Sequence, residues 1–108
     1  MYVRRKIPNH TKVYLTAFGY DTEDETQFVP SELSGQRAVD IHHIVGRGKT
    51  GEDRIENLMA LTRDEHLKHG DKVSDMIVLL IMHRDFLDRH NIEYDNQWFL
   101  KWINHYGN

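Results

Sequence analysis

The sequence predicts a single α+β domain in which two short strands lead into a series of helices. At 108 residues, the chain is long enough for one hydrophobic core but not for two. Two β-branched or apolar segments, 37–45 and 58–61, are separated by a glycine-containing polar loop, as is typical of strands. The later segments repeat apolar residues at three- and four-residue spacing, which indicates helices.

The segment before the first strand is the least informative part of the chain. We define 1–30 as an N-terminal extension, in which "KVYLTAFGY" (12–20) fits either a short helix or a strand and "DTEDET" is an acidic loop. Residues 31–36, "SELSGQ", have the composition of a turn. The expected core covers 31–70, followed by C-terminal helices over 71–108.

A helix start is predicted directly after the second strand. Thr62 and Glu65 fit a capping box, in which each side chain accepts a hydrogen bond from the other residue's backbone amide. The helix should therefore begin at Arg63, carry His66 and end near Gly70.

Two further helices are expected in the C-terminal third. Residues 71–88 have apolar positions on most sides, which indicates a helix that is buried on most sides or packs partly against a partner. Asp95 fits the N-cap of a final helix. The apolar face of that helix comprises Trp98, Phe99, Trp102, Ile103 and Tyr106.

Composition excludes several classes of protein. The longest apolar run, 76–82, has seven residues, whereas a membrane span needs roughly 20. The basic N-terminus lacks the apolar segment of a secretory signal, and the absence of cysteine excludes disulfides and thiolate metal sites. We therefore expect a cytoplasmic protein. The net charge of −3 does not by itself suggest a nucleic-acid partner.

Histidines and one asparagine form the most informative pattern. His42 and His43 are adjacent on the first predicted strand, Asn57 follows 14 positions after His43, and His66 lies nine positions beyond Asn57. A hairpin that leads into a helix can bring His42 and His66 together as metal ligands. His43, on the other side of the strand, would be free to accept a proton from water. Asn57 could hydrogen-bond across the loop and hold His43 in place. The histidines at 10, 83, 90 and 105 look like ordinary polar positions.

The stretches "IHHIVGRG" and "ENLMALTRDEHLKH" resemble the motif of the HNH endonucleases, over about residues 28–70. The resemblance implies a ββα-metal core in which His42 and His66 bind the metal and His43 is the general base. Asn57 would orient the loop, and His69 is a possible further ligand.

The resemblance also implies an activity: metal-dependent hydrolysis of DNA phosphodiester bonds. One divalent ion (Mg, Mn, Ni or Zn) is expected per site, and the size is similar to that of stand-alone phage and bacterial HNH proteins. The expected partner is DNA, and a second copy of the chain and an accessory phage or bacterial protein are further candidates. Arg47, Lys49 and Lys68 are candidate phosphate contacts, although each alone is more typical of a solvated charge. Asp40 is a candidate partner for a ligand imidazole or a solvated carboxylate.

The sequence departs from the family in one respect. Many members hold a structural zinc with two Cys-x-x-Cys pairs, but residues 31–34 and 62–65 read "SELS" and "TRDE" here. We therefore expect no structural zinc. Two alternatives remain open: an HNH-like nucleic-acid-binding module without catalysis, and a protein-interaction domain suggested by the net charge and the apolar stretch at 76–82.

Overall fold

The computed structural model describes residues 7–46, 51–70 and 72–107. The described part is α+β, with four α-helices, one 3-10 helix and a two-stranded sheet. The elements in chain order are α1 (Asn9–Ala17), β1 (Asp40–His43), η2 (Ile55–Asn57, the 3-10 helix), β2 (Leu58–Leu61), α2 (Arg63–His69), α3 (Val73–Arg89) and α4 (Asn96–Gly107). No helix in these residues is long and apolar enough to cross a membrane.

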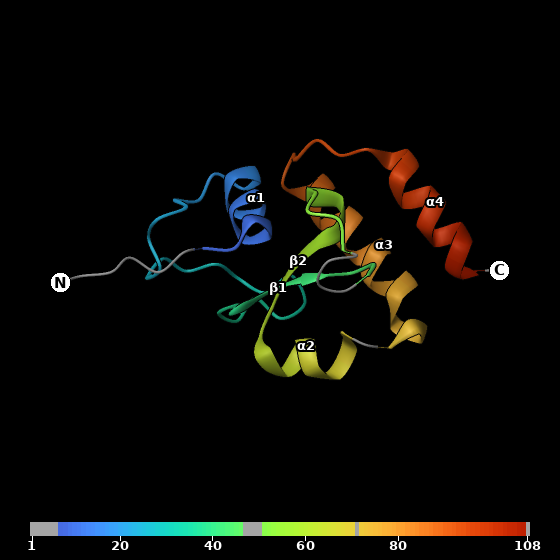
Figure 1. The fold of residues 1–108 in the computed structure, drawn as a ribbon, viewed down its shortest axis with the longest axis horizontal. Helices are drawn as coiled ribbons and strands as arrows, with labels where there is room; N and C mark the ends of the chain where they lie inside the picture. The colour runs from blue at the N-terminus through green and yellow to red at the C-terminus, as the bar shows by residue number, and fades with distance from the viewer. Residues whose placement is uncertain (1–6, 47–50, 71, 108) are drawn as a thin grey trace.

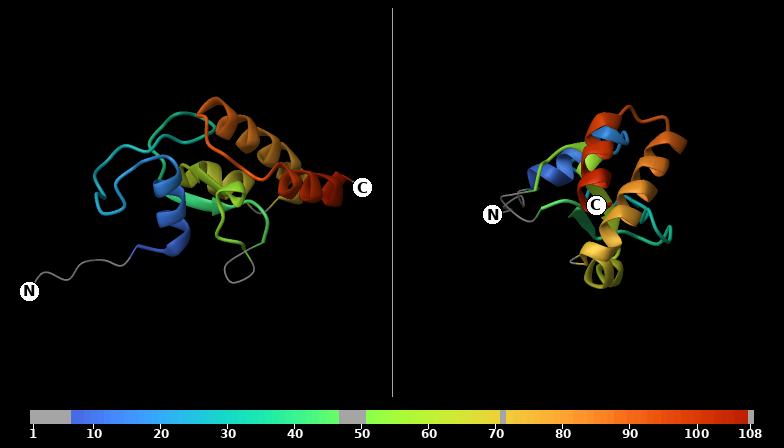
Figure 2. Two further views of the ribbon diagram at one scale, coloured as in Figure 1. Left: turned by 90° about the horizontal axis from the view of Figure 1, so that it is seen from above. Right: turned by 90° about the vertical axis from the view of Figure 1, so that its right-hand side faces the viewer.

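The hairpin of β1 and β2 lies between the helices. The strands are antiparallel, with Asp40 opposite Leu61 and His43 opposite Leu58. In Figures 1 and 2, α1 lies on one side of the hairpin, α3 and α4 lie on the other, and α2 follows the end of β2. All four residues of β2 are buried. This arrangement explains why "LMAL" is apolar throughout, since both faces of β2 are covered.

Alternate side chains of β2 enter two different hydrophobic clusters. Leu58 and Ala60 pack with Tyr14 of α1. Met59 and Leu61 belong to the larger cluster formed with the helices α3 and α4. The two-residue period of a strand thus connects the N-terminal helix to the C-terminal pair.

The prediction of the second strand over 58–61 is confirmed, whereas the first strand is shorter than predicted. It covers Asp40–His43 rather than all of 37–45, apart from an isolated bridge between Pro30 and Arg37. The strand ends because the chain turns after His43 and reaches Gly46, which has a positive φ of 81°. The undecided segment 12–20 is largely helical, within α1 and its C-terminal turn.

The predicted capping box is present and connects two segments. Thr62 Oγ1 accepts from the amide of Glu65 at 3.2 Å, and Glu65 Oε1 accepts from the amide of Thr62 at 2.9 Å. The Ser31 hydroxyl donates to the same Glu65 oxygen at 2.5 Å. Partial burial would raise the pKa of Glu65, but the hydrogen bonds from Ser31 and its neighbours lower it. Hydrogen bonds therefore join the 31–34 turn to the start of α2.

The C-terminal helices agree with their predicted positions, but α3 is buried on one side only. Leu79, Leu80 and Leu87 face the core, while Val78 and Ile81 are 54% and 44% exposed. The interpretation of a helix buried on most sides is therefore wrong for the described residues, because α4, η2 and the loops between the elements cover only one face. At the start of α4, the side-chain oxygen Oδ1 of Asp95 accepts a hydrogen bond from the amide of Gln97 at 3.0 Å, as an N-cap does.

His83 is not an ordinary polar position, since its side chain is fully buried on α3. Its Nδ1 lies 2.7 Å from Glu32 Oε1, and its Nε2 lies 2.6 Å from the carbonyl oxygen of Ile55. Glu32 also accepts from the hydroxyl of Tyr14 at 2.7 Å. Burial, together with the Glu32 carboxylate, raises the pKa of the Tyr14 phenol. This buried polar network connects α1, the 31–34 turn, η2 and α3.

Candidate active site

The hairpin and α2 bring the imidazoles of His42 and His66 together. Their ring centroids are 4.7 Å apart. His42 pairs with Met59 on β2, and the chain passes from Leu61 through the Thr62 cap directly into α2. The capping box therefore sets where the first turn of α2 begins, and with it the direction of His66. His42 is buried, whereas 37% of the His66 side chain is exposed.

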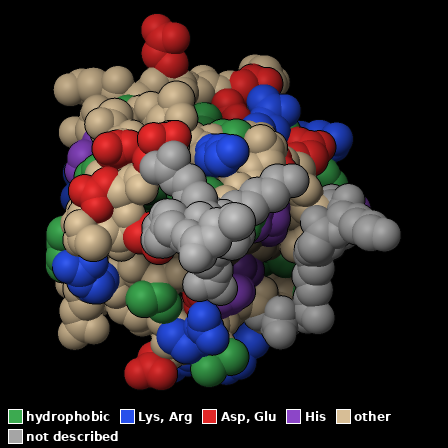
Figure 3. All heavy atoms as spheres, turned by 60° about the vertical axis from the view of Figure 1, so that its left-hand side comes forward, with side chains coloured by type: hydrophobic (Ala, Val, Ile, Leu, Met, Phe, Trp, Pro, Cys, Tyr) green, Lys and Arg blue, Asp and Glu red, His purple; other side chains and the backbone are tan. Residues whose placement is uncertain are grey.

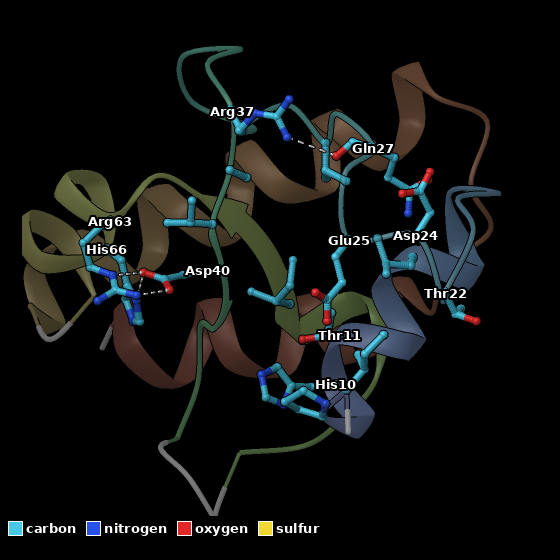
Figure 4. Close-up of a pocket in the computed structure, with 17 residues that line it drawn as sticks. His10, Thr11, Thr22, Asp24, Glu25, Gln27, Arg37, Asp40, Arg63 and His66 are labelled. Atoms are coloured by element: carbon cyan, nitrogen blue, oxygen red, sulfur yellow. Dashed lines mark hydrogen bonds and ion pairs between the residues drawn. The ribbon is translucent and has the colours of Figure 1, made fainter. Parts of the chain in front are cut away.

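Asp40 fixes the orientation of the His66 ring through a hydrogen bond. Its Oδ2 lies 3.0 Å from His66 Nδ1, and its two oxygens accept from Arg63 Nε at 2.8 Å and Nη2 at 3.0 Å. Figure 4 shows the side chains of Arg63 and His66 both directed at Asp40. Partial burial would raise the pKa of Asp40, but these hydrogen bonds outweigh it and lower the pKa. Of the two roles considered for Asp40, the geometry is that of an imidazole partner rather than a solvated carboxylate.

The residues at this position fit a divalent metal ion. A carboxylate that accepts from Nδ1 of a histidine leaves the Nε2 lone pair available, as in many metal-binding histidines. His42 supplies a second imidazole, and imidazoles bind zinc, nickel and other first-row metals. A Cβ on Gly70 would lie 2.5 Å from the carbonyl oxygen of His66, 2.7 Å from Cδ2 of its ring and 3.3 Å from Nε2, so the glycine allows close approach to both the backbone and the ring of His66.

His43 lies in a separate cluster. Its Nε2 is 2.8 Å from Oδ1 of Asp53, and 13% of its side chain is exposed. The other oxygen of Asp53 accepts from Nδ2 of Asn9 at 3.0 Å. Among the described residues, no group hydrogen-bonds to Nδ1 of His43. In a neutral His43 that donates from Nε2 to Asp53, Nδ1 carries the lone pair that can accept a proton.

His10 completes this second cluster. Its ring centroid lies 4.7 Å from that of His43, so the expectation that His10 is an ordinary polar position is wrong. Partial burial lowers the pKa of His10, and the nearby His43 lowers it further. Hydrogen bonds from His43 and Asn9 lower the pKa of Asp53. Sequence reasoning missed His10 and Asp53, because they lie 33 positions before and 10 positions after His43 with no motif to connect them.

Asn57 holds the chain directly after His43 rather than the His43 side chain itself. It is fully buried. Its Oδ1 accepts from the amide of Val45 at 2.8 Å, and its Nδ2 donates to the carbonyls of Val45 at 3.0 Å and Glu52 at 3.1 Å. Its backbone oxygen accepts from the amide of Ile44 at 3.0 Å. One side chain thus connects both ends of the loop that follows β1.

The remaining predicted residues lie outside these contacts or outside the described part of the chain. His69 Nδ1 lies 2.9 Å from Oδ2 of Asp75, near the start of α3. Lys68 is exposed on α2. Arg47 and Lys49 are outside the described residues.

The surface near the site is of mixed charge. A groove of about 810 Å³ runs between α1 and α2, with Asp24, Glu25 and Asp40 as its acidic and Arg37 and Arg63 as its basic lining residues. Figure 3 shows histidine side chains near the centre of one face, with basic and acidic side chains scattered around them. The groove is therefore not a dedicated phosphate-binding channel.

No family model matches the chain, and no curated protein or solved structure matches it.

Proposed function

We propose that the chain is a metal-dependent DNA endonuclease of the HNH type. The observation that carries the proposal is that two adjacent residues of β1 have different partners. His42 contacts His66, which Asp40 supports, while His43 bonds to Asp53. Hydrolysis of a phosphodiester needs both a place for a divalent ion and a proton acceptor, and we assign the first to His42 and His66 and the second to His43.

In this proposal His43 is the general base. Its Nδ1 accepts a proton from the attacking water as the water oxygen bonds to phosphorus. Asp53, which accepts from Nε2, keeps the ring in the required tautomer and stabilises the imidazolium that forms. The bond from phosphorus to the 3′ oxygen breaks and solvent protonates that oxygen, which leaves a 5′-phosphate and a 3′-hydroxyl.

His42 and His66 would hold the divalent ion, with Asp40 and Arg63 fixing the orientation of His66. Such an ion, when bound, stabilises negative charge on the phosphoryl and departing oxygens. His69 remains a possible additional ligand, although it pairs with Asp75 in this structure. Phosphate contacts would be local, with Lys68 on the exposed side of α2 as the described candidate, because the net charge is −3.

The test is cleavage of supercoiled plasmid at low salt after EDTA treatment, with Mg²⁺, Mn²⁺, Ni²⁺ and Zn²⁺ restored separately. We expect nicking with at least one ion. The rate should fall by about 10²–10⁴-fold in His43→Ala, which removes the general base. His66→Ala should lose both cleavage and one bound ion. His105→Ala, on the exposed side of α4, is the matched histidine control and should cleave normally.

Circular dichroism of each variant separates loss of function from loss of fold. Folded wild type that cleaves with none of the four ions would overturn the proposal. DNA binding without cleavage would then favour the HNH-like binding module. A His66→Ala variant that keeps wild-type metal affinity would overturn the ligand assignment.

A further inference from the structure

His10, His43 and Asp53 together have the donor set of a transition-metal site distinct from the His42 and His66 pair. Their potential ligand atoms lie within 4.8 Å of one another. Two imidazoles and one carboxylate suit zinc, cobalt or nickel, whereas Mg²⁺ prefers oxygen ligands alone. The three residues come from α1, β1 and the loop before η2, so the tertiary structure alone brings them together.

We propose that this cluster binds a zinc-type ion that switches off the nuclease by capturing its general base. The regulatory part of this inference depends on the proposed function, while the binding of the ion does not. Occupation of the site would require local adjustment of the three side chains, whose ligand atoms lie within 4.8 Å of one another. Oδ1 of Asp53 and Nε2 of His43 are 2.8 Å apart, whereas two ligands of one tetrahedral zinc are separated by about 3.3 Å when each bond is about 2.0–2.1 Å. The two side chains therefore need to separate by only about 0.5 Å.

The surroundings of the three residues favour this change. Asn9 donates to Oδ2 of Asp53, which keeps that oxygen in place. The other oxygen, Oδ1, can then move toward an ion. A Cβ on Gly51 would lie 2.8 Å from Cγ of His43, so the backbone at this glycine packs directly against the ring and limits its movement.

Inhibition follows from the tautomers of His43. In the tautomer assigned above, Nε2 of His43 carries the proton and donates to Asp53, and Nδ1 has the lone pair. An ion bound at Nε2 displaces that proton, which the solvent transfers to Nδ1. A His43 with a metal on one nitrogen and a proton on the other has no lone pair left for water. Zinc bound here would therefore stop proton transfer without touching His42 or His66.

The first experiment measures binding alone, by titration of Co²⁺ or Zn²⁺ into the full chain with absorption and calorimetric detection. We expect two ions per chain in wild type, one in His10→Gln and one in His66→Ala. For the His10 cluster, loss of a ligand should weaken binding by at least about tenfold. His105→Gln is the matched control and should bind two. A His10→Gln variant with wild-type stoichiometry and affinities would overturn the proposed site.

The second experiment measures cleavage as zinc is added, with the other ion that best supports nicking held at a saturating concentration. Zinc should inhibit wild type, and in His10→Gln the inhibitory concentration, measured relative to each protein's own rate without zinc, should rise by at least about tenfold. Equal inhibition of both proteins would overturn the switch. A further outcome is a wild type that binds two ions that respond to the variants as expected and yet fails to cleave DNA with any of the metals tested. In that case the second metal site stands and the proposed nuclease function is wrong.

Discussion

Asn57 offers the sharpest test of how the site is built, because one buried side chain makes three hydrogen bonds. Asn57→Ala removes the bonds to the amide and carbonyl of Val45 and to the carbonyl of Glu52. At a net value of about 1 kcal/mol for each bond, the free energy of unfolding should fall by about 3 kcal/mol. That is a large part of the 5–15 kcal/mol typical of a domain.

The assay is urea unfolding monitored by tryptophan fluorescence, with thermal unfolding alongside. A loss of about 3 kcal/mol corresponds to a decrease in Tm on the order of 10–20 °C. Asn57→Asp should be at least as destabilising, because a carboxylate would face the two carbonyl oxygens that the amide now satisfies. Asn104→Ala, at an exposed position of α4, is the matched control and should change the free energy of unfolding by less than about 0.5 kcal/mol. A loss below about 1 kcal/mol in Asn57→Ala would refute the reasoning that these bonds hold the loop.

Three further outcomes are expected. Glu32→Gln removes the carboxylate from the fully buried pair with His83, so the free energy of unfolding measured in urea should fall by about 3–5 kcal/mol. A decrease of less than about 1 kcal/mol would contradict the stabilising role of this pair. Gly70→Ala places a methyl group against His66, so the affinity for Zn²⁺ measured by calorimetry should fall by about tenfold. An unchanged affinity would show that Gly70 is not needed for the metal site. The lowered pKa of Asp40 means that its contribution to stability is complete above its unfolded-state pKa of about 4 and disappears as the pH falls through the folded-state pKa. In Asp40→Asn, Tm should therefore be lower at neutral pH and fall less than that of wild type below about pH 4; parallel Tm profiles would contradict this.

Much of the fold and part of the site could be predicted from the sequence. The second strand, the Thr62 capping box and the Asp95 cap are decided by contacts over a few residues, and short-range patterns report such contacts directly. The approach of His42 to His66 was also predictable, because a hairpin that leads into a capped helix leaves few other arrangements.

Only the tertiary structure decided the partners of the remaining polar groups. Glu32 and His83 are 51 positions apart, and Asp53 and Asn9 are 44 apart, so no local pattern could pair them. The same holds for α1, which fits a helix or a strand by its sequence and packs Tyr14 against β2 in the structure. Side-chain spacing determines local structure, but the partner of a buried charge depends on which distant segments the core brings together.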